Sequence, residues 1–511
     1  METIRITGAG SHLQGVGRLR DGRAAFVPFS IPGEVVDVEI VRDCGRYVEA
    51  RLLAVRESSP ARVEADCPAF GRCGGCQARH MAYEETLRLK RQRVADALER
   101  IGGLKDANVL DTLPMPEPLR CRNKAEYAVS GNNIGFLRAG SREVVPVEDC
   151  LLQREESVRA LRQLSREQLR GLRGAVTRVN RRGEVMLTLC GDAPRSPIRT
   201  FPGVASLYYC RLKPRPAHAL DGACNLLDGA ERLEETLCGL HFSLLPQSFF
   251  QINAAQAERM YTIALDALAL RPGDAALDAY CGAGTITLLM AARGANATGV
   301  EIVRPAVLDA IASAKRNGLD ARFLLGDAAE EIPRLVAAGE RFAAAVLDPP
   351  RRGADARVLQ ALISAAPQRI VYISCDPATL ARDLKTLATG GYQLEFAQPV
   401  DMFAYTGHVE TVVLLSKGEI DSKKVRVEFS LEDMDMSGFQ KGATYEQIKA
   451  YVLEHTGLKV SSLYISQIKR KCGLDVGQNY NLSKKEDAKV PQYPPEKEAA
   501  IRDALKYFQM I

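Results

Sequence analysis

Three stretches of the chain share one pattern of hydrophobic and polar positions. Each contains a run of four or five apolar residues rich in β-branched types, next to a polar or proline-bearing turn. This pattern is typical of strands in an open parallel sheet, where ligands bind outside the carboxyl ends of the strands. The three stretches carry Asp348, Cys375 and Glu410. The sequence therefore predicts that these residues converge on one crevice, which would be an active site.

The segment before these stretches has the pattern of a nucleotide-cofactor fold. Residues 254–270 are expected to form a helix, and residues 275–289 predict a strand, a Gly-x-Gly turn and a second helix. Such a turn lets the backbone approach a cofactor at a helix N-terminus. Glu301, about 20 residues later, has the spacing of an acid that binds ribose hydroxyls in dinucleotide and S-adenosylmethionine folds. Asp327 after a third strand and Asp348 before Pro-Pro favour a methyltransferase over a dehydrogenase.

The N-terminal residues have a different periodicity. Residues 1–58 contain five short runs separated by glycine, which predict a small closed barrel. Barrels of this kind bind single-stranded nucleic acid through basic and aromatic side chains. The candidates here are Arg18, Arg23, Phe26 and Arg46.

The region up to residue 250 is less regular. An amphipathic helix with a basic face is expected at residues 86–101. Strands at 183–190 and 206–212 indicate an α+β domain, and nine arginines against three glutamates lie between residues 151 and 183. Such a run is consistent with RNA contact or with a solvated helix face.

Composition limits the class of protein. The chain has 511 residues, is 46% hydrophobic and carries a net charge of +5, so we expect three or four domains and a charge too small to imply a polyanionic partner by itself. No apolar run is long enough to span a membrane, and the first residues lack a signal pattern, so we expect a cytoplasmic protein. Thirteen cysteines then indicate thiols or metal ligands rather than disulfides.

Three cysteines lie within ten residues. Cys67, Cys73 and Cys76 have the spacing C-x5-C-x2-C, and 73 residues separate the last of them from Cys150. Four thiolates hold either a structural zinc ion or an iron–sulfur cluster, and the spacing alone does not distinguish the two.

The motifs DPPRRG at 348–353, SCDPATLARDL at 374–384 and HVETVVLL at 408–415 resemble those of the RNA uracil-5-methyltransferase family, and the resemblance extends over residues 1–417. It implies that Cys375 is a nucleophile and that Glu410 is a general base. It also implies S-adenosylmethionine as the methyl donor. The contacts that it implies for this cofactor are Gln251, Tyr280, Glu301 and Asp348, with Asp327 near the adenine.

The resemblance extends to the rest of the chain. It implies that the barrel is a TRAM domain and that a 4Fe-4S cluster is bound by Cys67, Cys73, Cys76 and Cys150. The stretch 122–124 is similar to a segment near the substrate in the family's central domain. Cys121 stands where the family often has an aromatic residue, which leaves the role of that position open.

Residues 418–511 have no counterpart in the family's core. Two amphipathic helices, at 444–455 and 462–472, resemble helix-turn-helix or winged-helix geometry and suggest nucleic-acid contact, packing on the catalytic domain or self-association.

We therefore expect an α/β protein with four parts: a TRAM-like barrel (1–58), an iron–sulfur and central α+β RNA-binding domain (59–250), a Rossmann-like methyltransferase domain (251–417) and an appendage (418–511). The expected reaction is methylation of carbon-5 of a uridine in structured RNA, most readily 23S rRNA, by a monomeric enzyme. A transfer RNA T-loop is the alternative substrate. Methylation of a nucleobase amino group and RNA binding without catalysis are the alternative activities.

Overall fold

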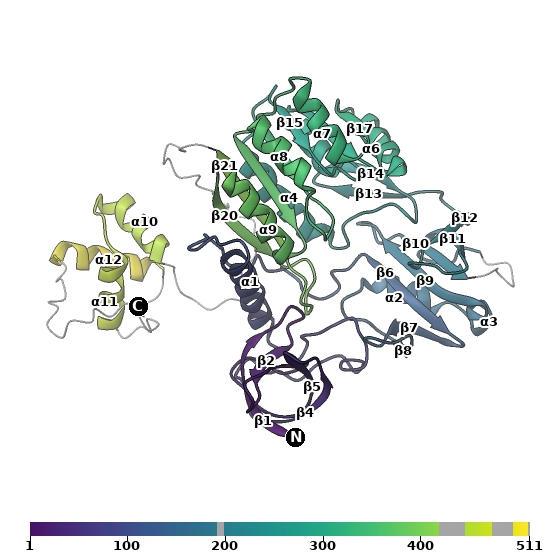
Figure 1. Cartoon of the computed structure of the whole chain (residues 1–511), viewed down its shortest axis with the longest axis horizontal. Coiled ribbons are helices and arrows are strands. Elements are labelled where there is room, and N and C mark those ends of the chain that lie inside the picture. The colour runs from purple at the N-terminus through teal and green to yellow at the C-terminus, as the bar shows by residue number, and fades with distance from the viewer. Residues whose placement is uncertain (192–198, 418–444, 473–493, 509–511) are drawn as a thin grey trace. The chain divides into compact units, whose positions relative to one another are not determined.

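A computed structural model describes residues 1–191, 199–417, 445–472 and 494–508. The chain divides into two compact units, residues 1–424 and 425–511 (Figure 1). No helix in these described ranges is long and apolar enough to cross a membrane. The start of the helix expected at 444–455 and the whole of 418–443 lie outside the described residues.

The N-terminal residues form a closed barrel with strand order β1-β2-β3-β5-β4, as predicted. Side chains alternate between the barrel interior and solvent, so Ile4 and Ile6 are buried while Arg5 is exposed. On β2, a Cβ at Gly17 would lie 2.6 Å from the carbonyl oxygen of Arg5, so the close approach of β1 and β2 requires glycine. The strands are β1 (Glu2–Ala9), β2 (Gly15–Arg18), β3 (Ala24–Val27), β4 (Val35–Asp43) and β5 (Tyr47–Glu57).

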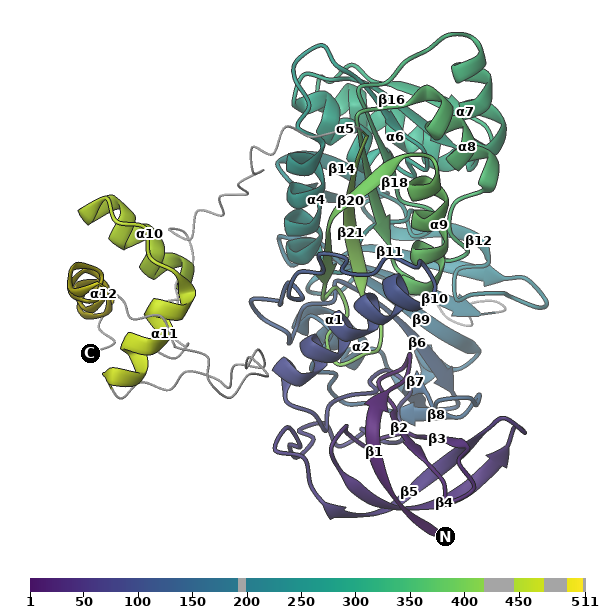
Figure 2. The ribbon, with the colours of Figure 1, turned by 60° about the vertical axis from the view of Figure 1, so that its left-hand side comes forward.

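Helix α1 (Tyr83–Arg100) connects the barrel region to a seven-stranded sheet of order β12-β11-β10-β9-β6-β7-β8 (Figure 2). The strands expected at 183–190 and 206–212 are β10 and β11, which are parallel neighbours in this sheet. The elements are β6 (Lys124–Ser130), β7 (Asn133–Leu137), β8 (Val144–Pro146), α2 (Glu155–Arg162), α3 (Arg166–Leu169), β9 (Leu172–Val179), β10 (Val185–Gly191), β11 (Val204–Leu212) and β12 (Gly222–Gly229). The hairpin of β13 (Leu233–Leu237) and β14 (Leu240–Leu244) follows.

The second seven-stranded sheet, of order β17-β16-β15-β18-β19-β21-β20, confirms the expected Rossmann-like α/β class. Its strand pairs are parallel except those of β21, which is antiparallel to both neighbours. The strands are β15 (Ala275–Asp278), β16 (Asn296–Glu301), β17 (Arg322–Leu325), β18 (Ala344–Leu347), β19 (Arg369–Ser374), β20 (Tyr392–Val400) and β21 (Glu410–Lys417). The helices are α4 (Ala254–Leu268), α5 (Thr285–Ala292), α6 (Arg304–Arg316), α7 (Ala328–Ala337), α8 (Ala356–Ala365) and α9 (Pro377–Thr389).

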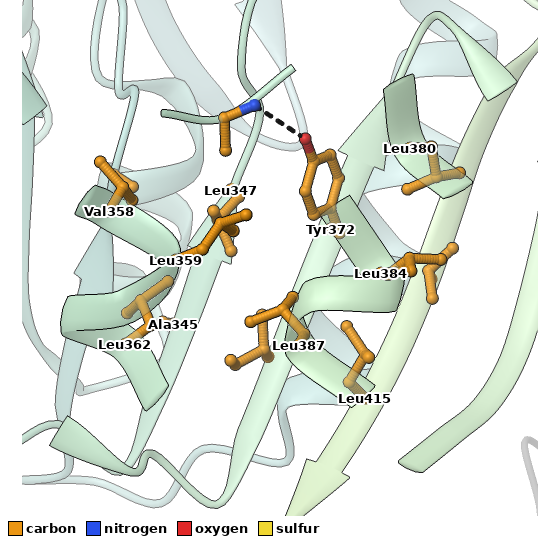
Figure 3. Packing of buried hydrophobic residues seen from close by; sticks show 14 of the residues in the cluster. Ala345, Leu347, Val358, Leu359, Leu362, Tyr372, Leu380, Leu384, Leu387 and Leu415 are labelled. Atoms are coloured by element: carbon orange, nitrogen blue, oxygen red, sulfur yellow. Dashed lines mark hydrogen bonds between the residues drawn. The ribbon is translucent and has the colours of Figure 1, made fainter. Parts of the chain in front are cut away.

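Helices cover both faces of this sheet, and each face has its own hydrophobic core. Figure 3 shows the core in which leucines of α8 and α9 pack against β18 and β19. The buried phenol of Tyr372 lies at the edge of this core. Its Oη accepts a hydrogen bond from the Ala354 N–H (3.2 Å) and donates one to Asp383 (2.6 Å). The packing thereby fixes the turn after β18 against α9, on the side of the sheet where the candidate site lies.

One expectation about strand direction was wrong. Asp348 and Cys375 follow the carboxyl ends of β18 and β19, as predicted, but Glu410 is the first residue of β21. Because β21 is antiparallel to its neighbours, its beginning lies at the same edge of the sheet as their ends. Glu410 therefore still lies at the edge of the sheet where Asp348 and Cys375 lie.

The second unit contains three helices in its described part: α10 (Tyr445–Thr456), α11 (Ser462–Lys471) and α12 (Pro495–Tyr507). They enclose a small core of their own, to which Ile448, Ile465 and Ile501 contribute. Tyr451 stacks on His455 with ring centroids 4.0 Å apart, and Tyr507 lies 4.6 Å from Tyr451.

Candidate active site

Cys375 lies in the turn between β19 and α9, one residue beyond the end of the strand. The Asp376 N–H donates to the Oγ of Ser374 (3.1 Å), which closes the turn. The Asp376 carboxylate accepts hydrogen bonds from the N–H groups of Ala378 and Thr379, so it caps α9 and fixes where the helix begins. The thiol is only partly buried. Local sequence thus presents Cys375 at the edge of the sheet.

Strand register places Glu410 beside Cys375. Ser374 of β19 pairs with Thr411 of β21 in an antiparallel ladder. The residue after Ser374 and the residue before Thr411 are therefore neighbours at the same edge. The electrostatics agree, because burial raises the pKa of Cys375 to about 11 and the Glu410 carboxylate contributes to the rise.

Three acids with raised pKa values gather at this edge. Burial raises the pKa of Glu410 to about 8, and the nearby charge of Asp348 adds to the shift. Burial and the charge of Asp278 raise the pKa of Asp348 to about 7. Burial also raises the pKa of Asp278 to about 6, although Thr287 donates a hydrogen bond to it. Such a cluster of perturbed acids is a common property of catalytic sites.

Arg351 opposes the acids. It lies in the turn after β18, and its positive charge acts to lower the pKa values of both Cys375 and Glu410. Arg351 therefore favours the charged forms of the Cys375 thiol and of the Glu410 carboxyl group.

The glycine-rich turn after β15 lies at the same edge of the sheet, because β15 is the parallel neighbour of β18. Gly282 and Gly284 have φ values of +55° and +81°, and a Cβ at Gly284 would lie 2.7 Å from the Cβ of Ala310. The Gly282 N–H donates to Oε2 of Glu301 (3.0 Å), and the Val303 N–H donates to Oε1 (2.7 Å). The Glu301 carboxylate therefore joins the ends of β15 and β16.

The other expected cofactor residues are held by identifiable contacts. The Tyr280 hydroxyl accepts a hydrogen bond from the Asp355 N–H (3.3 Å). The Gln251 side chain donates to the Oη of buried Tyr261 (3.2 Å). Asp327 is exposed and caps α7 through a 2.9 Å hydrogen bond, so the contact it makes in this structure is a helix cap.

Sequence reasoning missed Tyr261, Asp278 and Arg351. Asp278 ends β15, and its position before the glycine turn is a signal of the same kind that identified Glu301 and Asp348. Arg351 is part of the DPPRRG motif, but its effect on the thiol depends on how the turn folds. Tyr261 is on α4 and has no sequence signal, because its position resembles that of any buried aromatic residue.

The four cysteines expected to bind a cluster lie together. Cys67, Cys73, Cys76 and Cys150 line one cavity of about 70 Å³. Within the described ranges, however, no group of three or more His, Cys, Asp or Glu side chains is arranged to hold a metal ion. The fold therefore gathers the four thiols around one space.

The chemistry of this cavity fits a cationic centre with sulfur ligands. Burial raises the pKa of Cys76 to about 12 although the charges of Arg122 and Arg79 act to lower it, so the thiol is neutral at pH 7 when nothing is bound to the sulfur. Arg122 and Gln153 also line the cavity, and their buried Nε and Oε1 atoms have no hydrogen-bond partner in the part of the chain that the structure describes. A cluster held by four thiolates would offer sulfur acceptors to Arg122.

The barrel residues expected to contact RNA differ in exposure. Arg18 and Arg46 are exposed. Arg23 forms ion pairs with Asp21 and Asp43, and Phe26 packs edge-on against Tyr47 (5.4 Å). Arg23 and Phe26 therefore also have structural contacts within the barrel.

Comparison with known proteins agrees with this geometry. Residues 230–418 match the family model described as tRNA (Uracil-5-)-methyltransferase, and residues 2–53 match the TRAM domain. The chain is 38% identical over 424 residues to an uncharacterized RNA methyltransferase of Halalkalibacterium halodurans. This alignment covers 77% of this chain and 92% of the relative. It is 35% identical over 441 residues to one of Clostridium tetani, covering 81% and 95%. Among solved structures it is similar to the tRNA (uracil-54, C5)-methyltransferase of Pyrococcus abyssi in complex with S-adenosyl-L-homocysteine, with TM-score 0.66 and 28% identity, covering 81% of this chain and 99% of that one.

Proposed function

Because the chain belongs to the S-adenosylmethionine-dependent RNA uracil-5-methyltransferase family, we propose that it methylates carbon-5 of a uridine in structured RNA through a covalent bond from Cys375 to carbon-6. The observation that supports this proposal is the register of β19 and β21, which brings Cys375 and Glu410 to one edge of the sheet. The target base leaves its stack to reach the thiol.

The thiol is needed because carbon-5 of uracil is a weak nucleophile. The Cys375 thiolate forms a bond to carbon-6, and the electrons of the carbon-5–carbon-6 double bond move onto the carbonyl at carbon-4 as an enolate. Carbon-5 then takes the methyl group. Burial raises the pKa of the free thiol to about 11, so the thiol is mostly protonated at neutral pH before substrate binds.

The second half of the reaction needs a base. We assign removal of the carbon-5 proton to Glu410, after which the double bond re-forms and the thiolate leaves carbon-6. A base must be ionised, and the pKa of Glu410 is about 8. The elimination step should therefore accelerate as pH rises through about 8.

The bound cofactor supplies an electrophilic methyl group. We propose that Gln251, Tyr280, Glu301, Asp327 and Asp348 hold it. The hydrogen bonds to Glu301 and Tyr280 support this assignment, because they fix both side chains at the carboxyl edge of the sheet before any ligand arrives.

We propose that Cys67, Cys73, Cys76 and Cys150 bind a 4Fe-4S cluster. Two observations support a centre with sulfur ligands: the shared cavity, and the Arg122 Nε, which has no hydrogen-bond partner among the described residues. Because the cluster would join the loop at 67–76 to a distant cysteine, its contribution would be to the folding of that region.

For the substrate we propose 23S rRNA in the cytoplasm. Support comes from the resemblance of the cysteine motif to that of family members that carry a cluster, which mostly modify this RNA. Transfer RNA is the second candidate, favoured by the structural similarity to a tRNA methyltransferase. Mapping 5-methyluridine in ribosomal and transfer RNA from a strain that lacks the enzyme decides between them, because the unmodified position identifies the substrate.

We also propose functions for the parts of the chain outside residues 251–417. The barrel (1–58) and the central region (59–250) would bind the RNA fold. The appendage (418–511) would add RNA contacts, which the exposed aromatic ring of Tyr507 supports.

The test of the reaction is transfer of a labelled methyl group to RNA by the wild-type enzyme and by Cys375→Ala. The wild type should label carbon-5 of uridine, and Cys375→Ala should give no label. Persistent labelling of RNA by Cys375→Ala would instead favour methylation of a nucleobase amino group, which needs no cysteine.

A further inference from the structure

The loop that leads to Glu410 is held by a part of the chain far from it in sequence. This loop, residues 401–409 between β20 and β21, is called the base loop below. Segments from the first hundred residues contact it at its start, its middle and its end.

At its start, the base loop is anchored by a buried ion pair. Lys90 on α1 pairs with Asp401, and both side chains are fully buried. Lys90 also donates to the Phe403 carbonyl (3.0 Å), and the Tyr83 hydroxyl donates to Asp401 (2.7 Å). One end of the loop is thereby fixed to α1.

The middle of the base loop is bound by the residues that directly follow Cys76. The N–H groups of Gln77 and Ala78 both donate to the Tyr405 carbonyl, at 2.9 and 3.0 Å. The guanidinium of Arg79 lies 4.6 Å from the centre of the Tyr405 ring. Arg79 is itself buried and paired with Asp66, so the cation is fixed in place.

The last part of the loop packs closely against α1 and the barrel. Arg93 donates to the Gly407 carbonyl. A Cβ at Gly407 would lie 2.5 Å from the Ser11 carbonyl oxygen, which places the barrel directly against the loop.

Tyr405 has a backbone conformation that needs such support. Its φ of +58° is in the left-handed region, which is uncommon for a residue with a bulky side chain. Conformations of this kind persist when the surrounding structure determines them, and they concentrate at functional sites. Here the surrounding structure is the segment 77–79, and the base lies five residues further along the chain.

We propose that Tyr405 is a positioning residue for the base, and that residues 77–79 form a clamp which couples the cysteine site to the catalytic site. The proposal rests on the proposed function, because it assumes that Glu410 accepts the carbon-5 proton. According to this proposal, the cysteine site affects the elimination step of the reaction as well as the folding of its own region.

The clamp should affect the two halves of the reaction differently. Cys375 is carried by the turn between β19 and α9, whose own hydrogen bonds hold it. Loosening the base loop therefore leaves addition and methyl transfer intact and slows elimination. The signature is an enzyme that accumulates in covalent linkage to methylated RNA.

The test compares Tyr405→Ala with Tyr405→Phe. The alanine variant loses the ring over Arg79, whereas the phenylalanine variant keeps it and is the matched control. Elimination by Tyr405→Ala should slow by about 10- to 100-fold, less than the 10²- to 10⁴-fold typical of losing a general base entirely. The covalent species should accumulate, while Tyr405→Phe behaves as the wild type. Equal turnover without a covalent species in both variants would refute the positioning role.

Hydrogen exchange gives a readout that does not depend on activity. Peptides covering the base loop should exchange faster in folded Tyr405→Ala than in Tyr405→Phe. The same peptides should exchange faster in the wild type after its iron is removed by a chelator. Unchanged exchange after chelation would refute the coupling to the cysteine site.

Glu410→Gln separates failure of this inference from failure of the proposed function. If Glu410→Gln accumulates the covalent species and Tyr405→Ala does not, only the clamp is wrong. If Glu410→Gln accumulates none, the assignment of the base is wrong, and the hydrogen-exchange comparison alone still tests the clamp.

Discussion

The charge of Glu410 should control how readily Cys375 ionises, and Glu410→Gln isolates that effect. Burial and the Glu410 carboxylate raise the pKa of Cys375 to about 11, against an ordinary value of 9.0. At pH 9 the thiolate fraction is then about 1%, compared with about 50% for an ordinary thiol. Alkylation by iodoacetamide should therefore be roughly 50-fold slower at Cys375 in the folded enzyme than at the same residue in unfolded protein.

The substitution should have an effect only where Glu410 is charged. With a pKa of about 8, Glu410 is mostly protonated at pH 6.5 and mostly ionised at pH 9. Glu410→Gln removes the negative charge, so the pKa of Cys375 falls and alkylation at pH 9 becomes faster than in the wild type. At pH 6.5 the two proteins should react alike. Arg351→Gln provides the opposite control, because losing a cation raises the pKa of the thiol and slows the reaction.

The assay is mass spectrometry of the peptide that contains Cys375 after timed alkylation between pH 6 and 11. The shape of the pH dependence reports the pKa and does not depend on how accessible the sulfur is; in the wild type the rate should still be rising at pH 11. If alkylation levels off near pH 9 in the wild type, or if Glu410→Gln slows the reaction at pH 9, the electrostatic description of the site is wrong.

Three further predictions concern the rest of the chain. Protein purified without oxygen should be brown and contain iron and sulfide, and Cys76→Ser should lose both, whereas colourless protein with zinc would contradict the cluster. Deleting residues 418–511 should weaken RNA binding and reduce its dependence on salt while leaving cofactor affinity unchanged; equal RNA affinity and salt dependence would argue for packing or assembly. Lys90→Met should lower the free energy of unfolding in urea by about 3–5 kcal/mol, because Asp401 is left charged and buried. The double variant with Asp401→Leu should recover most of the lost free energy.

The sequence predicts the elements of this fold well wherever the hydrophobic pattern is regular. The barrel strands follow from short runs separated by glycine, and the buried strands of the catalytic sheet follow from continuous apolar runs. Strand direction was harder, since Glu410 was expected beyond the carboxyl end of a strand and instead begins β21. Whether a strand enters a sheet parallel or antiparallel depends on the preceding connection, and the chemistry at its ends gives no sign of it.

The candidate site was predicted as a set of residues, but not as an electrostatic unit. Cys375, Glu410 and Asp348 have local motifs, so the sequence identifies them. Asp278 and Arg351 act on their pKa values only because separate turns meet at one edge. The contacts between residues 77–79 and Tyr405 span more than 300 positions, and no local pattern predicts a tertiary contact of that kind.

The central claim is that Cys375 forms the covalent intermediate and that Glu410 acts in its breakdown. Incubation of Glu410→Gln with substrate RNA and a labelled methyl donor tests this claim most directly. The glutamine cannot accept the carbon-5 proton, so addition and methyl transfer proceed while elimination stalls. We predict a labelled protein–RNA species that survives denaturing electrophoresis and is absent from the double variant with Cys375→Ala. Normal turnover by Glu410→Gln, or a labelled species that persists without Cys375, would contradict the assignment of base and nucleophile.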